Sequence, residues 1–166
     1  MDTPLKVTVY IPTHNYEQFV AQAIQSVLSQ SAKDWELIVV DDGSTDGTRD
    51  ILSKYSGHQK IRVVEQEKRG LNVTNNIAMR LARGKYLIRL DADDYMDENL
   101  LMILSSVLDD KPEVGLVYPD YFLVDEHGNI LEMVRRKKII EEDAVFDLPA
   151  HGACTMIRKE CLLAVG

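Results

Sequence analysis

The chain has 166 residues, of which 45% are hydrophobic and 28% charged, and its formal net charge is −8. This length suits one domain with a core of its own, and the acidic balance argues against a protein that binds nucleic acid through its phosphates. No apolar run reaches the ~18 residues of a transmembrane helix, and the N-terminus lacks the apolar core of a signal peptide.

Strand-like and helix-like segments alternate along the first two thirds of the sequence. Short β-branched and apolar runs predict strands, and apolar residues spaced i, i+3 and i+4 predict helices. In chain order these are a strand over 7–11, a helix over 19–28, a strand over 37–40, a helix around 51–55, a strand over 61–64, a helix over 71–83, a strand over 86–90 and a helix over 97–110. We expect Gly84 to end the third helix as a left-handed C′ glycine.

After Pro112 the pattern changes. Strands are predicted over 114–124 and 130–134, joined by a turn-forming cluster at 125–129. Four β-α units in succession predict a mainly parallel sheet flanked by helices, and the two later strands predict an antiparallel C-terminal annex. We therefore expect a single α/β domain over 1–166, divided into β/α units over 1–112 and a second half over 113–166.

Distinctive polar residues follow three of the four predicted strands, at 12–15, 41–44 and 91–94. In an open parallel sheet, ligands bind beyond the carboxyl ends of the strands. Five of the eight residues from Asp91 to Glu98 are acidic, and like charges ~4 Å apart repel by roughly 4 kcal/mol at an effective dielectric of 20. A bound cation relieves this repulsion, and carboxylates without neighbouring Cys or His favour Mg²⁺ or Mn²⁺.

Simpler explanations apply to some of these residues. Asp97 and Glu98 stand where a helix is expected to begin, and acidic residues favour helix N-termini. For Asp41 and Asp42 the pattern leaves two options open, a ligand-binding pair or a cap for the following helix. The sequence has neither the dinucleotide fingerprint G-x-G-x-x-G nor a P-loop.

Seven segments in order resemble family 2 glycosyltransferases of the GT-A fold. They begin with Val7-Thr8-Val9-Tyr10-Ile11-Pro12-Thr13-His14-Asn15-Tyr16 and include Leu90-Asp91-Ala92-Asp93-Asp94, which is similar to the D-x-D segment of that family. The segments are 7–16, 23–30, 36–48, 70–76, 82–87, 90–94 and 151–160. The resemblance implies a Rossmann-like GT-A fold whose first part, over 1–112, binds a nucleotide sugar.

The resemblance also assigns roles to individual positions. It implies that Asp93 ligates the metal directly, and that Asp91 contacts the ribose or the metal through water. His151 and Gly152 match a stretch on the acceptor side, although His151 also suits a partly buried structural histidine. The family's Arg-Asn pair is here Asn75-Asn76, so Lys68 or Arg69 would have to supply the missing cation. The nucleotide-sugar-binding positions that the resemblance implies are Pro12, Thr13, Glu17, Asp41, Asp42, Asn76, Asp91 and Ala92.

The implied reaction is an inverting hexosyl transfer from a nucleoside-diphosphate sugar, a UDP-sugar, to a hydroxyl of a saccharide or lipid-linked saccharide. The implied cofactor is Mg²⁺ or Mn²⁺, and the implied setting is polysaccharide biosynthesis in the cytoplasm, with attachment to the inner membrane face through other regions or partners. No residue before Gly166 matches the family's general base. We therefore expect a truncated chain that binds donor and metal but transfers sugar poorly.

Two other function classes remain as alternatives. In a haloacid dehalogenase-type phosphatase, Asp91 would be the nucleophile and Asp93 the acid, but three β-α units precede this segment instead of an early strand. A non-catalytic nucleotide-sugar-binding or scaffolding module would explain the missing base. Uridine-nucleotide binding that depends on a divalent ion separates the transferase lineage from the scaffold.

Overall fold

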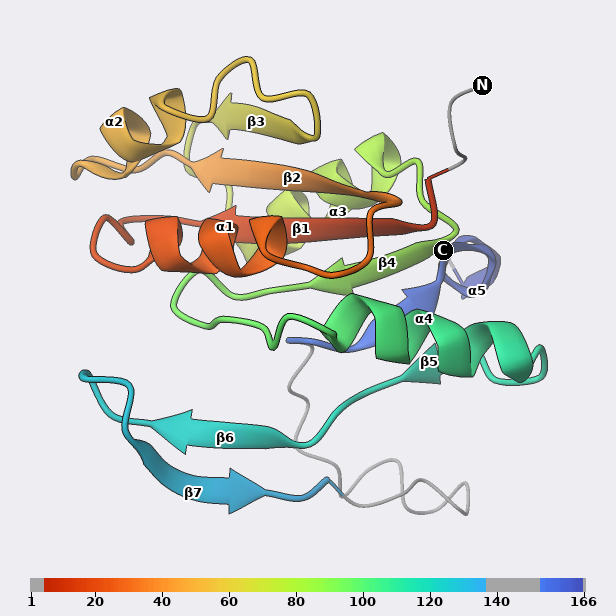
Figure 1. Ribbon diagram of the computed structural model, residues 1–166. Helices are drawn as coiled ribbons and strands as arrows, with labels where there is room; N and C mark the ends of the chain where they lie inside the picture. The colour runs from red at the N-terminus through yellow and green to blue at the C-terminus, as the bar shows by residue number, and fades with distance from the viewer. Residues whose placement is uncertain (1–4, 137–152, 166) are drawn as a thin grey trace.

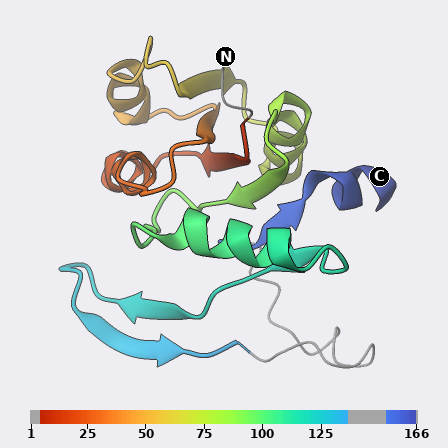
Figure 2. The same ribbon diagram turned by 45° about the vertical axis from the view of Figure 1, so that its right-hand side comes forward.

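A central sheet of six strands organises the chain, and helices cover both of its faces (Figures 1 and 2). The computed structural model describes residues 5–136 and 153–165. The strands are β1 (Val7–Thr13), β2 (Trp35–Asp42), β3 (Ile61–Gln66), β4 (Tyr86–Arg89), β5 (Leu116–Val117), β6 (Tyr121–Val124), β7 (Ile130–Val134) and β8 (Met156–Arg158). The helices are α1 (Val20–Leu28), α2 (Thr48–Ser53), α3 (Leu71–Leu81), α4 (Leu100–Asp110) and α5 (Lys159–Val165).

The strand order in the sheet is β3-β2-β1-β4-β8-β5. β1 pairs in parallel with both β2 and β4, and β2 pairs in parallel with β3. β8 lies between β4 and β5 and is antiparallel to both. The predicted α/β class with a mainly parallel sheet is confirmed, and the carboxyl ends of β1, β2 and β4 meet at one edge.

Two apolar layers enclose the sheet. Successive side chains of β2 point to opposite faces, so this strand contributes residues to both layers. All eight residues of β2 are buried, the pattern of a strand that is covered on both faces. On one face, α1, α2 and α4 contribute the buried residues Val20, Ala23, Ile24, Val27, Leu52, Leu101, Leu104 and Leu108. On the other face, α3 and the turn after it contribute Ala78 and Ala82, which pack with Tyr10, Ile38, Val40 and Leu87.

The role predicted for Gly84 as a helix-ending glycine is wrong. Helix α3 ends at Leu81, and Ala82 already has an extended backbone. Gly84 is buried against β1, where its N–H donates a hydrogen bond to Thr8 Oγ1 at 2.9 Å. A Cβ at this position would lie 2.5 Å from Thr8 N. Glycine is therefore required here for the close approach of two backbone segments.

Helix α4 begins at Leu100, three residues after the predicted start, and distant residues bind free backbone groups at both of its ends. Asp97 accepts a hydrogen bond from Asn99 N at 2.9 Å in the turn before the helix. The buried Gln30 side chain accepts from Leu101 N at 3.0 Å and donates to the Asp97 carbonyl at 2.6 Å. At the other end, the Arg158 guanidinium donates to the carbonyls of Leu108 and Lys111.

The second half differs from the prediction in two respects, of which the first is that β8, for which no strand was predicted, joins the central sheet between β4 and β5. The second is that the strand predicted over 114–124 is two strands, β5 in the central sheet and β6 in a separate antiparallel pair with β7. Figure 1 shows this β6–β7 hairpin below α4, apart from the central sheet. Among the helices that the structure describes, none is long and apolar enough to cross a membrane.

Candidate functional site

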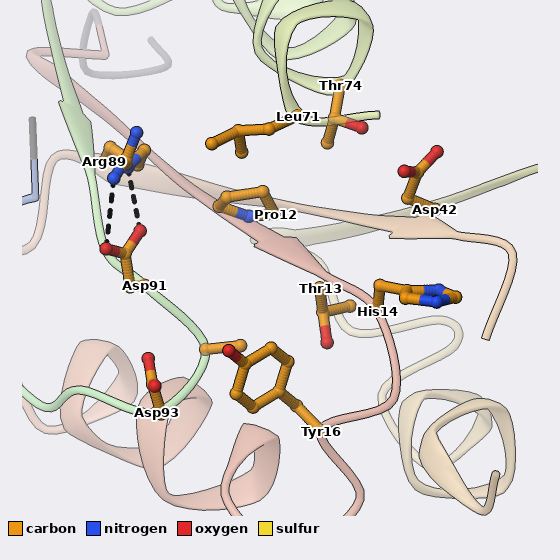
Figure 3. Close-up of a pocket in the computed structure, with 11 residues that line it drawn as sticks. Pro12, Thr13, His14, Tyr16, Asp42, Leu71, Thr74, Arg89, Asp91 and Asp93 are labelled. Atoms are coloured by element: carbon orange, nitrogen blue, oxygen red, sulfur yellow. Dashed lines mark hydrogen bonds and ion pairs between the residues drawn. The ribbon is translucent and has the colours of Figure 1, made fainter. Parts of the chain in front are cut away.

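A pocket of about 300 Å³ opens where β1, β2 and β4 end and α3 begins (Figure 3). Side chains from all four elements, and from the loops that follow β1 and β4, line it. They are Pro12, Thr13, His14, Tyr16, Asp42, Leu71, Thr74, Arg89, Asp91, Ala92 and Asp93. Five of the positions predicted to bind the nucleotide sugar, and the predicted metal ligand, are thus brought together.

Asp42 stands at the α3 end of the pocket and orders the loop that leads into that helix. Its carboxylate accepts hydrogen bonds from Arg69 N at 2.7 Å, Gly70 N at 2.8 Å and Gln66 Nε2 at 2.6 Å. Burial raises the pKa of Asp42, but these hydrogen bonds outweigh it and leave the pKa below its usual value. The carboxylate is therefore an anion that holds the first turn of α3 against the pocket.

Asp41, the other member of the predicted pair, does not line the pocket. It is fully buried, and it accepts hydrogen bonds from Ser44 N at 3.1 Å and from Arg49 Nε at 3.0 Å. Both partners lie in the segment that leads into and forms α2. The structure therefore gives Asp41 contacts within the β2–α2 turn.

Two more predicted positions lie outside the pocket lining. The Glu17 carboxylate accepts a hydrogen bond from Gly47 N at 2.5 Å, which links the loops after β1 and β2. Asn76 is exposed on α3. Neither Asn75 nor Asn76 belongs to the pocket lining. Lys68 and Arg69, which were expected to supply the missing cation, do not belong to it either. His151 and Gly152 lie outside the described residues.

Two residues of the pocket lining carry polar side-chain atoms that have no hydrogen-bond partner among the described residues. These are Thr13 Oγ1 and His14 Nδ1, both shielded from solvent. The other ring nitrogen of His14, Nε2, lies 2.9 Å from Nζ of Lys68, which is not itself a lining residue. Buried polar atoms are normally satisfied, and both residues belong to the pocket lining, so a polar ligand is one partner that could satisfy them.

Asp91 and Arg89 form a charge pair at the opposite side of the pocket (Figure 3). Arg89 Nε lies 2.8 Å from Asp91 Oδ1, and Arg89 Nη2 donates a hydrogen bond to Asp91 Oδ2 at 3.0 Å. The two side chains are 19% and 33% exposed. The negative charge of Asp91, the first carboxylate of the D-x-D segment, is therefore balanced by Arg89.

Asp93 has a different environment. It is exposed, and no Lys, Arg or His among the described residues lies within ion-pair distance of it. The Asp93 carboxylate raises the pKa of the nearby Tyr16 phenol, with burial and Asp91 adding to the effect. Among the described residues, no group of three or more His, Cys, Asp and Glu side chains is arranged so that it could hold a metal ion by itself. The structure thus offers Asp93 as an exposed carboxylate of the pocket lining, beside the Tyr16 phenol.

Some lining residues were not predicted as site residues. Tyr16, Leu71 and Thr74 come from a loop and from the first turn of α3, where the sequence shows no motif that marks a ligand site. Arg89 had a detectable signal, because it stands two residues before Asp91. Residues i and i+2 of a strand face the same side, so an Arg-x-Asp segment at the end of a strand predicts an ion pair.

Comparisons with known proteins agree on one family. Residues 8–165 match the family model described as glycosyl transferase family 2. The chain is 32% identical to the putative glycosyltransferase EpsE of Bacillus subtilis over 163 residues, which cover 94% of this chain and 58% of that protein. It is also 32% identical to a chondroitin synthase of Escherichia coli over 126 residues, which cover 75% of this chain and 18% of that protein. The chain spans less than two thirds of either relative.

Two solved structures share the fold. S. aureus TarS 1–349 in complex with UDP-GlcNAc superposes with a TM-score of 0.79 at 23% identity, covering 97% of this chain and 47% of that one. The mannosyltransferase PcManGT from Pyrobaculum calidifontis, in complex with GDP-Man and Mn²⁺, gives a TM-score of 0.73 at 23% identity, covering 97% and 46%. Because the family model matches nearly the whole of this chain and the fold agrees with it, this chain belongs to glycosyltransferase family 2.

Proposed function

We propose that this chain carries the donor-binding part of an inverting hexosyltransferase that moves a sugar from a UDP-sugar to an acceptor hydroxyl with the help of Mg²⁺ or Mn²⁺. The observation that carries the proposal is the pocket itself. It combines the two D-x-D carboxylates with buried polar atoms of Thr13, His14 and Arg89 that have no hydrogen-bond partner among the described residues. Family membership favours this reading over the phosphatase, in which Asp91 would be a nucleophile.

In the proposed complex, the nucleoside lies toward α3 and the diphosphate toward the end of β4. Thr13 and His14 would offer polar atoms to the base, and Asp42 would keep the Gly70 turn in place beside it. Asp91, fixed by Arg89, would face the ribose. Because the loops at 13–16 and 91–93 line one pocket, a donor bound there would be held along its whole length.

The D-x-D carboxylates fit a hard divalent ion, since Asp93 is exposed and free of cationic partners among the described residues. We assign Asp93 as the ligand, with Asp91 reaching the ion through water. When bound, the ion would offset the negative charge that develops on the leaving diphosphate. Mg²⁺ and Mn²⁺ usually take one or two protein carboxylates together with substrate phosphates, which agrees with the single open carboxylate here.

For the acceptor we propose a saccharide, free or lipid-linked, used in polysaccharide assembly in the cytoplasm. The support is the similarity to proteins named for chondroitin synthesis and for teichuronic acid biosynthesis. Inversion requires the acceptor hydroxyl to attack the anomeric carbon from the side opposite the diphosphate, and a base must take its proton. We propose that the base is not among the lining residues, so the chain alone would bind donor far better than it transfers sugar.

Isothermal titration calorimetry with UDP tests the proposal. We expect binding that requires Mn²⁺ or Mg²⁺, that weakens at least about tenfold in Asp93→Asn, and that is unchanged in Asp50→Asn, an exposed aspartate on α2. A parallel titration with GDP tests the choice of base. If neither UDP nor GDP bound, whether Mn²⁺ or Mg²⁺ was present, the proposal would be overturned and a non-catalytic scaffolding module would be favoured.

A further inference from the structure

Arg89 is the lining residue whose chemistry the proposed donor complex does not yet explain. It is the single Lys or Arg among the residues that line the pocket, against the three carboxylates of Asp42, Asp91 and Asp93. It sits at the last position of β4, paired in register with Tyr10 of β1. Its guanidinium therefore comes from the rigid centre of the sheet and not from a loop.

Among the described residues, the hydrogen bond and the ion pair of the Arg89 side chain are both made with Asp91. Arg89 Nη2 donates to Asp91 Oδ2 at 3.0 Å, and Nε lies 2.8 Å from Oδ1 without the alignment of a hydrogen bond. Among the described residues, its guanidinium makes no other hydrogen bond and no second ion pair. Compare Arg158, whose guanidinium donates to three carbonyls and so ties elements together. Arg89 lacks that tethering pattern.

The pair has a consequence for the two acidic residues of the D-x-D segment. Both oxygens of Asp91 are engaged by one cation, whereas Asp93 faces none among the described residues. A carboxylate held in this way is poorly available as a direct metal ligand, and the nearby positive charge lowers the attraction of the site for a free cation. The same positive charge favours an anionic diphosphate.

We propose that Arg89 is a positioning residue that separates the roles of the two carboxylates. Its guanidinium holds Asp91 in an orientation that serves the nucleotide sugar and keeps it off the divalent ion, so that Asp93 alone ligates the ion directly. This inference rests on the proposed function, because it describes how that donor site divides metal and nucleotide binding. It makes Arg89 a determinant of the balance between metal and donor affinity.

The proposal predicts opposite effects on two ligands. In Arg89→Gln, Asp91 is released and one positive charge is lost, so Mn²⁺ alone should bind about threefold more tightly or better. UDP at saturating Mn²⁺ should bind at least about fivefold more weakly, because its contact carboxylate is no longer oriented and now repels the diphosphate. A residue needed only for folding would weaken both ligands together.

Mn²⁺ binding is measured by water-proton relaxation, and UDP binding by calorimetry, on the whole chain. Arg89→Lys keeps the charge but loses the planar fork, so it should bind Mn²⁺ within about twofold of the wild type and UDP with intermediate affinity. Arg62→Gln, which removes an exposed arginine on the far strand β3, is the matched control and should alter neither affinity. Thermal melting of each variant verifies that it is folded.

Unchanged or weaker Mn²⁺ binding in folded Arg89→Gln overturns the inference, and so does unchanged UDP binding. The proposed function fails in a different way, namely if the wild-type chain binds no nucleotide at all. The two failures are therefore separated by the wild-type titration.

Discussion

Adjacent residues of β2 perform different tasks because successive side chains of a strand point to opposite faces. Asp41 turns toward the face covered by α1 and α2, where Ser44 and Arg49 bind it. Asp42 turns toward the face covered by α3, where it accepts the N–H groups of Arg69 and Gly70. A pair that looks like one motif in the sequence is thus divided between a turn and the pocket.

This division leads to a prediction for Asp42→Asn. An amide has one acceptor oxygen where the carboxylate has two, and its NH₂ group faces backbone donors, so at least one of these N–H groups loses its partner. We expect a loss of about 1–3 kcal/mol in the free energy of unfolding and weaker UDP binding, measured by urea denaturation and calorimetry.

Asp50→Asn is the matched control, because Asp50 is exposed on α2. It should leave both quantities within experimental error. If Asp42→Asn retained full stability and full UDP affinity, Asp42 would have no part in ordering the first turn of α3.

The sequence predicted much of the pocket but not the division of labour within it. Pro12, Thr13, Asp42, Asp91 and Asp93 all line it, because strand ends and a D-x-D segment are local patterns. The contacts of Asp41 with Arg49 and of Asp42 with Gly70 depend on which face of β2 each side chain occupies. That choice is made by the packing of the whole sheet.

At the scale of the elements, close contacts between segments distant in sequence replace local capping. Helix α4 has no side-chain cap from its own N-cap residue, Asn99. Gln30 instead satisfies one of its free N–H groups, and Arg158 satisfies carbonyls at its C-terminus. Helix ends need such partners, and here two residues from the chain's opposite thirds provide them. The local sequence therefore predicts that a helix forms here, but it does not predict the residue at which the helix begins.

Gly84 gives a test at this scale. In Gly84→Ala, the added Cβ would overlap the backbone of β1, 2.5 Å from Thr8 N and 2.7 Å from Val7 C. Since backbone atoms cannot move aside cheaply, we expect destabilisation by about 3 kcal/mol or more, seen as a lower midpoint of urea unfolding.

Gly57→Ala serves as the comparison. Gly57 has a positive φ of +91°, but nothing lies within 4 Å of its virtual Cβ. Only the backbone preference is lost there, at about 1 kcal/mol. Equal effects of the two substitutions would contradict the close approach of Gly84 to β1.

For the whole molecule, clustered charges at the amino end of the sheet link elements that are far apart in sequence. Asp109 of α4 lies 2.8 Å from Lys6 Nζ and 2.9 Å from Lys85 Nζ, and accepts a hydrogen bond from Tyr86 Oη at 2.6 Å. Hydrogen bonds from Lys6, Tyr86 and Lys85 hold the pKa of Asp109 well below its usual value. Hydrogen bonds from Arg83 and Thr8 outweigh burial and lower the pKa of Glu36 as well.

A group whose pKa is lower in the folded state stabilises the fold above its unfolded pKa and loses that contribution as the pH falls. The ordinary values for these carboxyls are 3.8 for Asp109 and 4.5 for Glu36. We therefore expect the midpoint of urea unfolding to be constant from pH 7 to about 5 and to decline steadily below that.

Asp109→Asn should lower the midpoint at pH 7 and make the decline below pH 5 shallower. Asp110→Asn, which changes the neighbouring exposed aspartate, should leave the profile as in the wild type. A wild-type midpoint that rises on acidification would show that relief of the net charge of −8 dominates over these contacts.

The position of β8 bears on how the protein forms during synthesis. β8 fills the gap between β4 and β5, although some seventy residues of chain separate β4 from it. Until Met156–Arg158 leaves the ribosome, β4 presents a bare hydrogen-bonding edge and β5 has no partner strand. Unpaired edges invite association with other chains, and distant pairings close slowly. Nascent chains halted before this strand should accordingly be prone to aggregate, while those carrying it should acquire resistance to proteolysis in a single step.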